Sequence, residues 1–244
     1  MDAGNGIHYR RLINKSEPGY INSGSRTLFK EMKHKYTHLL WDFNGTIYAD
    51  MNASRMATNC LLKARGLKEI STPEEMRQKF GFPVKDYYEY LGFDYSVEKY
   101  EDIAAEWIKL YSAMSEQALL CEGVADAITK LHNDGYIQSI ISACEHTMLQ
   151  EKLQKLGISR FFSDISGTND VSAHSKSQVA LKWRENNPDA TAIMIGDTPH
   201  DYEVASLIGV DCVLYSGGFV SESRLKNIGV PIVSKFDELF NYIY

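Results

Sequence analysis

The chain has 244 residues, of which 44% are hydrophobic and 24% are charged, a balance typical of a globular protein with one sizeable core. Its net charge of −6 argues against a protein that binds nucleic acid or an anionic membrane through a positive surface. No apolar run approaches the roughly 20 residues of a membrane helix. Four cysteines are scattered along the chain without a C-x-x-C pair, which indicates a reducing compartment. We therefore expect a cytoplasmic protein without nucleic-acid or membrane partners.

Residues 1–36 come first in chain order and show no regular pattern, apart from a short helical pattern in RTLFKEMKHK (residues 26–35). Glycine, asparagine, serine and charged residues occur throughout, so the segment lacks the apolar region of a secretory signal. We expect an N-terminal extension and assign no role to it.

Four short apolar segments then predict buried strands, and the patterns between them predict helices. In residues 122–135 and 146–157 the apolar side chains recur at helical spacing, and Gly135 and Gly157 stand where a helix ends. Because helices alternate with apolar strands, we expect an α/β fold: a Rossmann-like, doubly wound parallel sheet covered on both faces. The strand segments are 36–43, 136–143, 190–197 and 210–217.

The interval between the first two strands breaks this alternation, because residues 52–122 carry helix signals and no strand pattern. In TPEEM, Thr72 suits an N-cap, Pro73 the first helical position and Glu75 a capping box. We expect a core domain from residues 37–51 and 123–244 and an inserted α-helical domain from residues 52–122. The insert would stand over the carboxyl ends of the strands, where open α/β sheets bind ligands.

Polar side chains stand at the ends of the predicted strands or at the start of the following helix. Asp42 follows LLW, Ser142 follows SII, and Asp197 closes AIMIG with Asp201 four residues later. Lys176 lies near the start of another helix. Taken singly, each suits a turn, an N-cap or a solvated charge, although the two carboxylates of GDTPHD also suit a hard cation.

Taken in order, these motifs resemble the haloacid dehalogenase superfamily. The resemblance rests on DFNGT, the strand-end serine, the helix-start lysine and GDTPHD, and it covers roughly residues 37–220. Within the superfamily the chain is similar to phosphoglycolate phosphatase-like members that carry a helical cap. Such a chain is expected to be a phosphatase that hydrolyses a small phosphorylated metabolite, as a monomer or a homodimer.

The resemblance assigns Asp42 as the catalytic nucleophile that forms an aspartyl-phosphate. The metal ligands for Mg²⁺ would be Asp42, the backbone carbonyl of Asn44, and Asp197, with Asp201 ordering a water on the ion. Such a cation would let several carboxylates share one site.

The resemblance also supplies phosphate-binding residues. Ser142 and Lys176 would bind the phosphoryl oxygens, and Thr46 would support the phosphate-binding loop. In the insert, GFPVKDYYEY is the candidate substrate segment, with Phe82 and Lys85 as its candidate residues.

Asn44 departs from the family, whose phosphatases have an aspartate there to protonate the leaving oxygen and to activate water. An amide cannot move a proton in this way, and general acid–base help contributes about 10²–10⁴ in rate. Three explanations stay open: a leaving group that needs little protonation, another acid such as His200 or a residue of the insert, or a slow enzyme.

Two other functions stay open from the sequence. A relative without the second aspartate, phosphonoacetaldehyde hydrolase, cleaves a carbon–phosphorus bond with a lysine of its cap, and Lys85 would take that place here. Alternatively, the chain could bind a phosphorylated metabolite with little or no turnover, which would use Ser142 and Lys176.

Overall fold

The computed structural model describes residues 34–168 and 173–244, with residues 173–175 described by their backbone alone. The helical pattern in residues 26–35 therefore falls almost entirely outside the described part of the chain. Among the helices that are described, none is both long and apolar enough to cross a membrane.

A parallel sheet of six strands forms the core, in the order β3-β2-β1-β4-β5-β6. The chain builds outward from β1 in one direction through β2 and β3, and then returns to add β4 on the other side of β1. The direction in which successive strands are added therefore reverses between β1 and β4, which is the switch point of a doubly wound sheet. The α/β class predicted from the sequence is confirmed. The strands are β1 His38–Trp41, β2 Ile137–Glu145, β3 Asp164–Thr168, β4 Ala192–Gly196, β5 Asp211–Tyr215 and β6 Ile232–Val233.

Helices cover both faces of the sheet, because successive side chains of a strand point to opposite sides. Leu39 and Trp41 of β1 belong to a buried cluster with Ile128, whereas Leu40 packs in a second cluster with Trp183. The first face is covered by α5 (Val124–Asn133), α6 (His146–Lys155), η3 (Phe236–Leu239) and α10 (Phe240–Ile243), and the second by α7 (Ala173–Asn186) and α8 (Pro199–Leu207).

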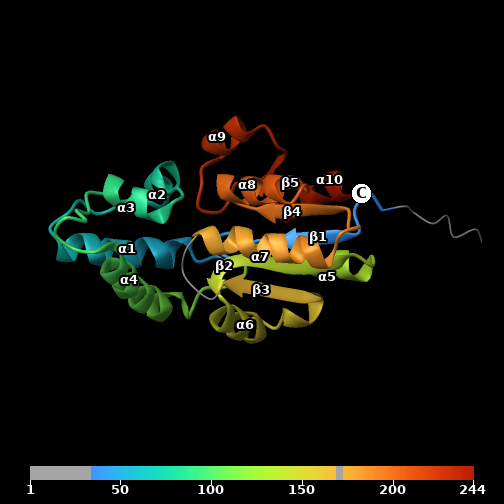
Figure 1. The fold of residues 1–244 in the computed structure, drawn as a ribbon, viewed down its shortest axis with the longest axis horizontal. Helices are drawn as coiled ribbons and strands as arrows, with labels where there is room; N and C mark the ends of the chain where they lie inside the picture. The colour runs from blue at the N-terminus through green and yellow to red at the C-terminus, as the bar shows by residue number, and fades with distance from the viewer. Residues whose placement is uncertain (1–33, 169–172) are drawn as a thin grey trace, which may run out of the picture. The chain divides into compact units, whose positions relative to one another are not determined.

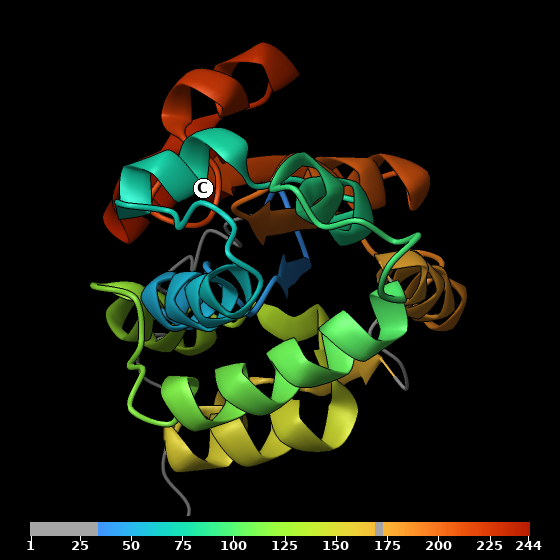
Figure 2. The ribbon, with the colours of Figure 1, turned by 90° about the vertical axis from the view of Figure 1, so that its left-hand side faces the viewer.

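The first four of the five helices between β1 and β2 are called the inserted helices below, a name kept for α1–α4. They are α1 Met51–Ala64, α2 Pro73–Lys79, α3 Val84–Tyr90 and α4 Tyr100–Ser115. The strand arrows point toward them (Figure 1), so they stand at the carboxyl edge of the sheet. In the view of Figure 2, α1 and α4 lie side by side.

The inserted helices share a hydrophobic cluster that includes Leu61, Met76, Tyr88 and Ile103, and Phe219 from the segment after β5 also belongs to it. The segments that lead into and out of them run antiparallel, with Tyr48 bridged to Leu120. This pairing supports an insert, and its folding as a separate domain over residues 52–122 stays a prediction.

Three short elements lie between strands of the sheet: η1 Ser159–Phe161 precedes β3, and α9 Glu222–Leu225 and η2 Lys226–Ile228 precede β6.

Three sequence expectations differ from the structure in detail. The pattern missed β3 and β6 because both are edge strands, one of them only two residues long. Ser142 does not end β2, which continues to Glu145 with a shifted register. In the predicted capping box, Thr72 accepts a hydrogen bond from the Glu75 backbone, but Glu75 accepts one from Ser71 N.

Candidate active site

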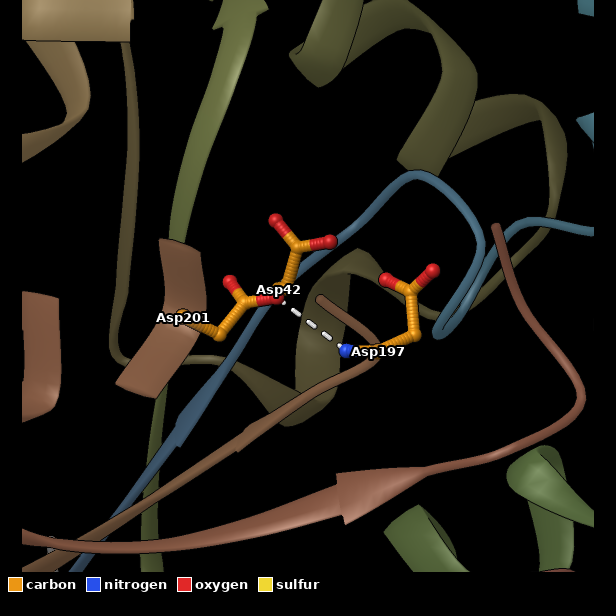
Figure 3. A group of neighbouring side chains, drawn as sticks. All are labelled: Asp42, Asp197 and Asp201. Carbon is orange, nitrogen blue, oxygen red and sulfur yellow. Dashed lines mark hydrogen bonds between the residues drawn. The ribbon is translucent and has the colours of Figure 1, made fainter. Parts of the chain in front are cut away.

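Three buried carboxylates meet where the strand order changes direction. Asp42 directly follows β1, Asp197 directly follows β4, and Asp201 lies in the first turn of α8. Each offers a carboxylate oxygen, and these oxygens lie within 4.8 Å of one another. Figure 3 shows the three side chains converging from the separate segments. We call them the carboxylate cluster, and they occupy the edge where doubly wound sheets bind ligands.

Close backbone packing holds Asp197 and Asp201 in place. A Cβ atom on Gly45 would lie 2.5 Å from Asp197 Oδ2, and the positive φ of 77° at Gly45 also favours glycine. A Cβ atom on Gly218 would overlap the Asp197 carboxylate, and one on Gly196 would overlap that of Asp201. The chain can therefore approach these two carboxylates only because glycine occupies the three positions.

Lys176 of α7 is the counter-charge within the cluster. Its Nζ lies 2.5 Å from Asp42 Oδ1 and 2.5 Å from Asp201 Oδ1, and only 3% of the residue is exposed. Burial opposes the charged form of the ammonium, but the carboxylates of Asp201 and Asp42 outweigh it and raise the Lys176 pKa. The lysine therefore stays charged.

One ammonium leaves negative charge in excess among three buried carboxylates. Burial raises the pKa of Asp42 to about 7 even though Lys176 opposes the shift. Burial, together with the charges of Asp42 and Asp201, also raises the pKa of Asp197 well above its usual range. Among the described residues, no second lysine, arginine or histidine forms an ion pair with the cluster. A bound cation would relieve this imbalance.

The oxygen donors of the site suit a hard divalent cation. Asp197 accepts hydrogen bonds from Thr46 Oγ1 at 3.0 Å and from Phe219 N at 2.6 Å, which fix the orientation of its carboxylate. The backbone carbonyl oxygen of Asn44 accepts no hydrogen bond from the described residues. Carboxylate and carbonyl oxygens are the ligands that Mg²⁺ and Ca²⁺ prefer, so the residues present fit such an ion.

Asp201 serves the helix and the cluster at once. Its Oδ2 accepts hydrogen bonds from Asp197 N at 3.1 Å and from Thr198 N at 2.9 Å, closing a capping box at the start of α8. Its Oδ1 contacts Lys176. Asp201 is therefore the N3 residue of the capping box and not the N-cap, which is Thr198, and the same carboxylate belongs to the cluster.

The other predicted polar residues lie on the same edge of the sheet. Ser142 is buried, and its Oγ accepts a hydrogen bond from Cys144 N at 3.0 Å. No described residue accepts a hydrogen bond from the Ser142 hydroxyl, so that hydroxyl is free to donate one. It does not cap α6, because Glu145 does so.

Asn44 contacts a buried carboxylate outside the cluster, that of Asp50. Its Nδ2 donates to Asp50 Oδ2 at 2.7 Å and to the Tyr111 hydroxyl at 2.9 Å. Tyr111 itself donates to Asp50 Oδ2 at 2.5 Å. Sequence reasoning missed both partners. Asp50 stands directly before a helix, where an N-cap is the simplest interpretation, and a tyrosine such as Tyr111 among apolar residues at helical spacing indicates only a buried helix face.

The two predicted substrate residues of the insert differ in their surroundings. The Phe82 ring packs against the ring of His200, beside Asp201, with 4.9 Å between centroids. His200 Nε2 is buried without a hydrogen-bond partner among the described residues. Lys85 is exposed, and its ammonium lies 5.2 Å from the centre of the Tyr95 ring. No hydrogen bond or ion pair connects Lys85 to the carboxylate cluster in the described part of the chain.

Arg77 of α2 connects the inserted helices to the loop that covers Asp197. Its Nε donates to Gly218 O at 2.9 Å and its Nη2 to Gly217 O at 3.0 Å. Arg224 in turn donates to the Arg77 carbonyl at 2.9 Å. No motif in the sequence indicated these contacts, because they join segments more than 100 residues apart.

A doubly wound parallel sheet with a carboxylate cluster at its switch point is the arrangement of α/β proteins that bind ligands at this edge. The family model described as haloacid dehalogenase-like hydrolase matches residues 39–215. The chain belongs to this family.

Known proteins of the family resemble the chain at low sequence identity. A phosphoglycolate phosphatase of Aliivibrio fischeri is 24% identical over 155 residues, 59% of this chain and 67% of that protein. One of Pseudomonas fluorescens is 26% identical over 152 residues, 59% of this chain but only 53% of its own length. A haloacid dehalogenase-like hydrolase family protein of Streptococcus pneumoniae has the same fold, with a TM-score of 0.71, 21% identity and coverage of 86% of this chain and 99% of its own.

Proposed function

We propose that this protein is a Mg²⁺-dependent phosphatase that hydrolyses a small phosphorylated metabolite through an aspartyl-phosphate on Asp42. The observation that carries the proposal is the carboxylate cluster, in which Lys176 compensates only part of the buried negative charge. The names of the curated relatives support a phosphate ester as the substrate.

The ligands proposed for Mg²⁺ are Asp42, the backbone carbonyl of Asn44, and Asp197, with Asp201 orienting a water of the ion. When bound, the ion would neutralise charge on the carboxylates and on the phosphoryl oxygens. The hydrogen bond from Thr46 Oγ1 to Asp197 Oδ1 restrains that carboxylate, which supports a role for Thr46 in the site.

In the first step, a carboxylate oxygen of Asp42 forms a bond to phosphorus while the bond to the leaving oxygen breaks. The leaving oxygen keeps the bonding electrons. In the second step, the oxygen of a water molecule would bond to phosphorus while the bond between phosphorus and the Asp42 oxygen breaks, with the bonding electrons returning to the carboxylate. The proton of that water would pass to solvent as inorganic phosphate leaves, because Asn44 cannot accept it. Lys176 and the free hydroxyl of Ser142 would bind the phosphoryl oxygens, since charge neutralisation and positioning dominate this chemistry.

Asn44 restricts the substrates that such a site can process rapidly. An amide supplies no proton to the leaving oxygen, and its nitrogen already binds Asp50 and Tyr111. Substrates with stable leaving groups, such as aryl or acyl phosphates, are therefore favoured over alkyl phosphates.

Carbon–phosphorus cleavage has less support. A lysine that forms a Schiff base must reach the substrate beside Asp42, whereas the Lys85 ammonium packs over the Tyr95 ring at the protein surface. No observation favours this alternative over ester hydrolysis.

The function is tested by phosphate release from a panel of aryl, acyl and alkyl phosphates, with Mg²⁺ and with EDTA. We expect release that requires Mg²⁺, with alkyl phosphates slower than aryl phosphates by about 10²–10⁴, because no acid assists the poorer leaving group. Release that persists in EDTA would contradict the metal requirement. A protein that binds the phosphates without releasing phosphate would instead be a binding protein.

A further inference from the structure

Asp50 is a buried carboxylate that the proposed reaction does not use. It is 1% exposed, and burial raises its pKa. No lysine or arginine forms an ion pair with it among the described residues. Its contacts are hydrogen bonds from the segment that follows Asp42 and from the inserted helix α4.

Each oxygen of Asp50 has its own donor. Oδ1 accepts from the backbone of Gly45 at 3.0 Å. Oδ2 accepts from Asn44 Nδ2 at 2.7 Å and from the Tyr111 hydroxyl at 2.5 Å. A side chain at position 50 must therefore accept on both sides, which a carboxylate does and an amide cannot.

The same contacts determine what position 44 requires. The atom that faces Asp50 must be a donor, and only the nitrogen of the Asn44 carboxamide qualifies. The carboxamide oxygen accepts no hydrogen bond from the described residues. Position 44 thus presents an acceptor as its one side-chain polar atom without a partner.

We propose that Asn44 and Asp50 form a matched amide–carboxylate pair, in which Asp50 and Tyr111 are positioning residues for Asn44. The consequence for catalysis rests on the proposed function. Because Tyr111 belongs to α4, the pair also couples the position of the inserted helices to the segment that carries the nucleophile. Buried Asp50 then requires a hydrogen-bond donor at position 44, so the asparagine there has a structural reason besides the loss of a general acid.

The pair predicts an unusual result for exchanged side chains. In Asn44→Asp, two carboxylates face each other across 2.7 Å, so we expect at least a tenfold loss in the folding equilibrium constant and in kcat, for aryl and alkyl phosphates alike. In Asp50→Asn, an amide nitrogen must face either Gly45 N or Asn44 Nδ2, and a similar loss follows.

The double variant Asn44→Asp/Asp50→Asn exchanges donor and acceptor between positions 44 and 50, and the Tyr111 hydroxyl then donates to position 44 and accepts from position 50. The new amide nitrogen at position 50 donates to the carboxylate at position 44, while the new amide oxygen accepts from Gly45 N. We expect the double variant to recover at least tenfold in the folding equilibrium constant relative to either single variant. It should also gain on alkyl phosphates, because position 44 then holds a carboxyl group.

Tyr111→Phe is the milder test of positioning, and Tyr87→Phe is its matched control. Tyr87 is also buried on an inserted helix, but its hydroxyl has no hydrogen-bond partner in the described part of the chain. We expect Tyr111→Phe to lower kcat at least fivefold with less than a twofold change in KM, and Tyr87→Phe to change neither.

Urea unfolding in EDTA measures the folding equilibrium constants of the unaltered protein, the two single variants and the double variant. This double-mutant cycle therefore does not depend on activity. Strictly additive effects of Asn44→Asp and Asp50→Asn would overturn the pair, as would a gain on alkyl phosphates by Asn44→Asp alone. Equal kcat in Tyr111→Phe and Tyr87→Phe would overturn the positioning role. Absence of Mg²⁺-dependent phosphate release in the unaltered protein would contradict only the proposed function, since coupling in the unfolding cycle would stand.

Discussion

Phosphate release is expected to fall at least about a thousandfold in Asp42→Asn, a loss of roughly 4 kcal/mol in transition-state stabilisation. The substitution removes the oxygen that would bond to phosphorus and one anionic oxygen proposed to bind the cation. It keeps the size of the side chain, and it removes a buried carboxylate whose pKa is raised by burial. The folded state should therefore persist while the covalent route is lost.

The surface residue Asp94 provides the matched control, because the same exchange there changes a carboxylate whose contacts are with Ser96. Asp94→Asn should leave the rate of phosphate release unchanged. Comparison of kcat/KM for purified, folded variants is the measurement. A rate in Asp42→Asn within tenfold of the unaltered protein would exclude Asp42 as the nucleophile.

Lys176→Met is expected to destabilise the protein by about 3–5 kcal/mol in EDTA, because it leaves buried carboxylates without their counter-charge. Both Asp42 and Asp201 lose an ion pair of 2.5 Å. The loss should shrink when Mg²⁺ is added, since a cation that binds only the folded state stabilises it. Phosphate release should also fall at least about a hundredfold, since the lysine would bind the phosphoryl oxygens.

Urea unfolding with EDTA or with Mg²⁺ measures these changes, and Lys130→Met is the control. Lys130 forms a surface ion pair with Asp134 at 2.9 Å, and such pairs contribute little. We expect this control to show little change in stability and none in phosphate release. If Lys176→Met is as stable as Lys130→Met in EDTA, the cluster does not hold the buried charges described above.

The sequence predicted the part of the site that depends on local pattern. Asp42 and Asp197 could be placed because each directly follows a short apolar strand, and parallel strands bring their carboxyl ends to one edge. The neighbouring positions of β1 and β4 could not be derived from these patterns, because strand order depends on long-range packing. The edge strand β3 was missed because the pattern required an apolar run, and DISGT is not one.

Contacts between distant segments explain what else remained hidden. Lys176 lies 134 residues from Asp42 in sequence, and its charge alone favoured a solvated helix-start residue. Asp50 is only six residues from Asn44, but its role depends on Tyr111 of α4, which lies 61 residues further on. The sequence therefore indicated that Asn44 departs from the family. The hydrogen bond to Asp50, which explains the amide, could be identified only from the folded structure.

Chemical trapping of the phosphoryl group tests the central claim most directly. Protein mixed with an aryl phosphate and Mg²⁺ is quenched in acid and treated with borohydride, which reduces an aspartyl-phosphate to homoserine, and its peptides are analysed by mass spectrometry. We predict homoserine at position 42, absent when EDTA replaces Mg²⁺ and absent in Asp42→Asn. Rapid Mg²⁺-dependent phosphate release with unmodified Asp42, or with homoserine at another aspartate, would contradict the account.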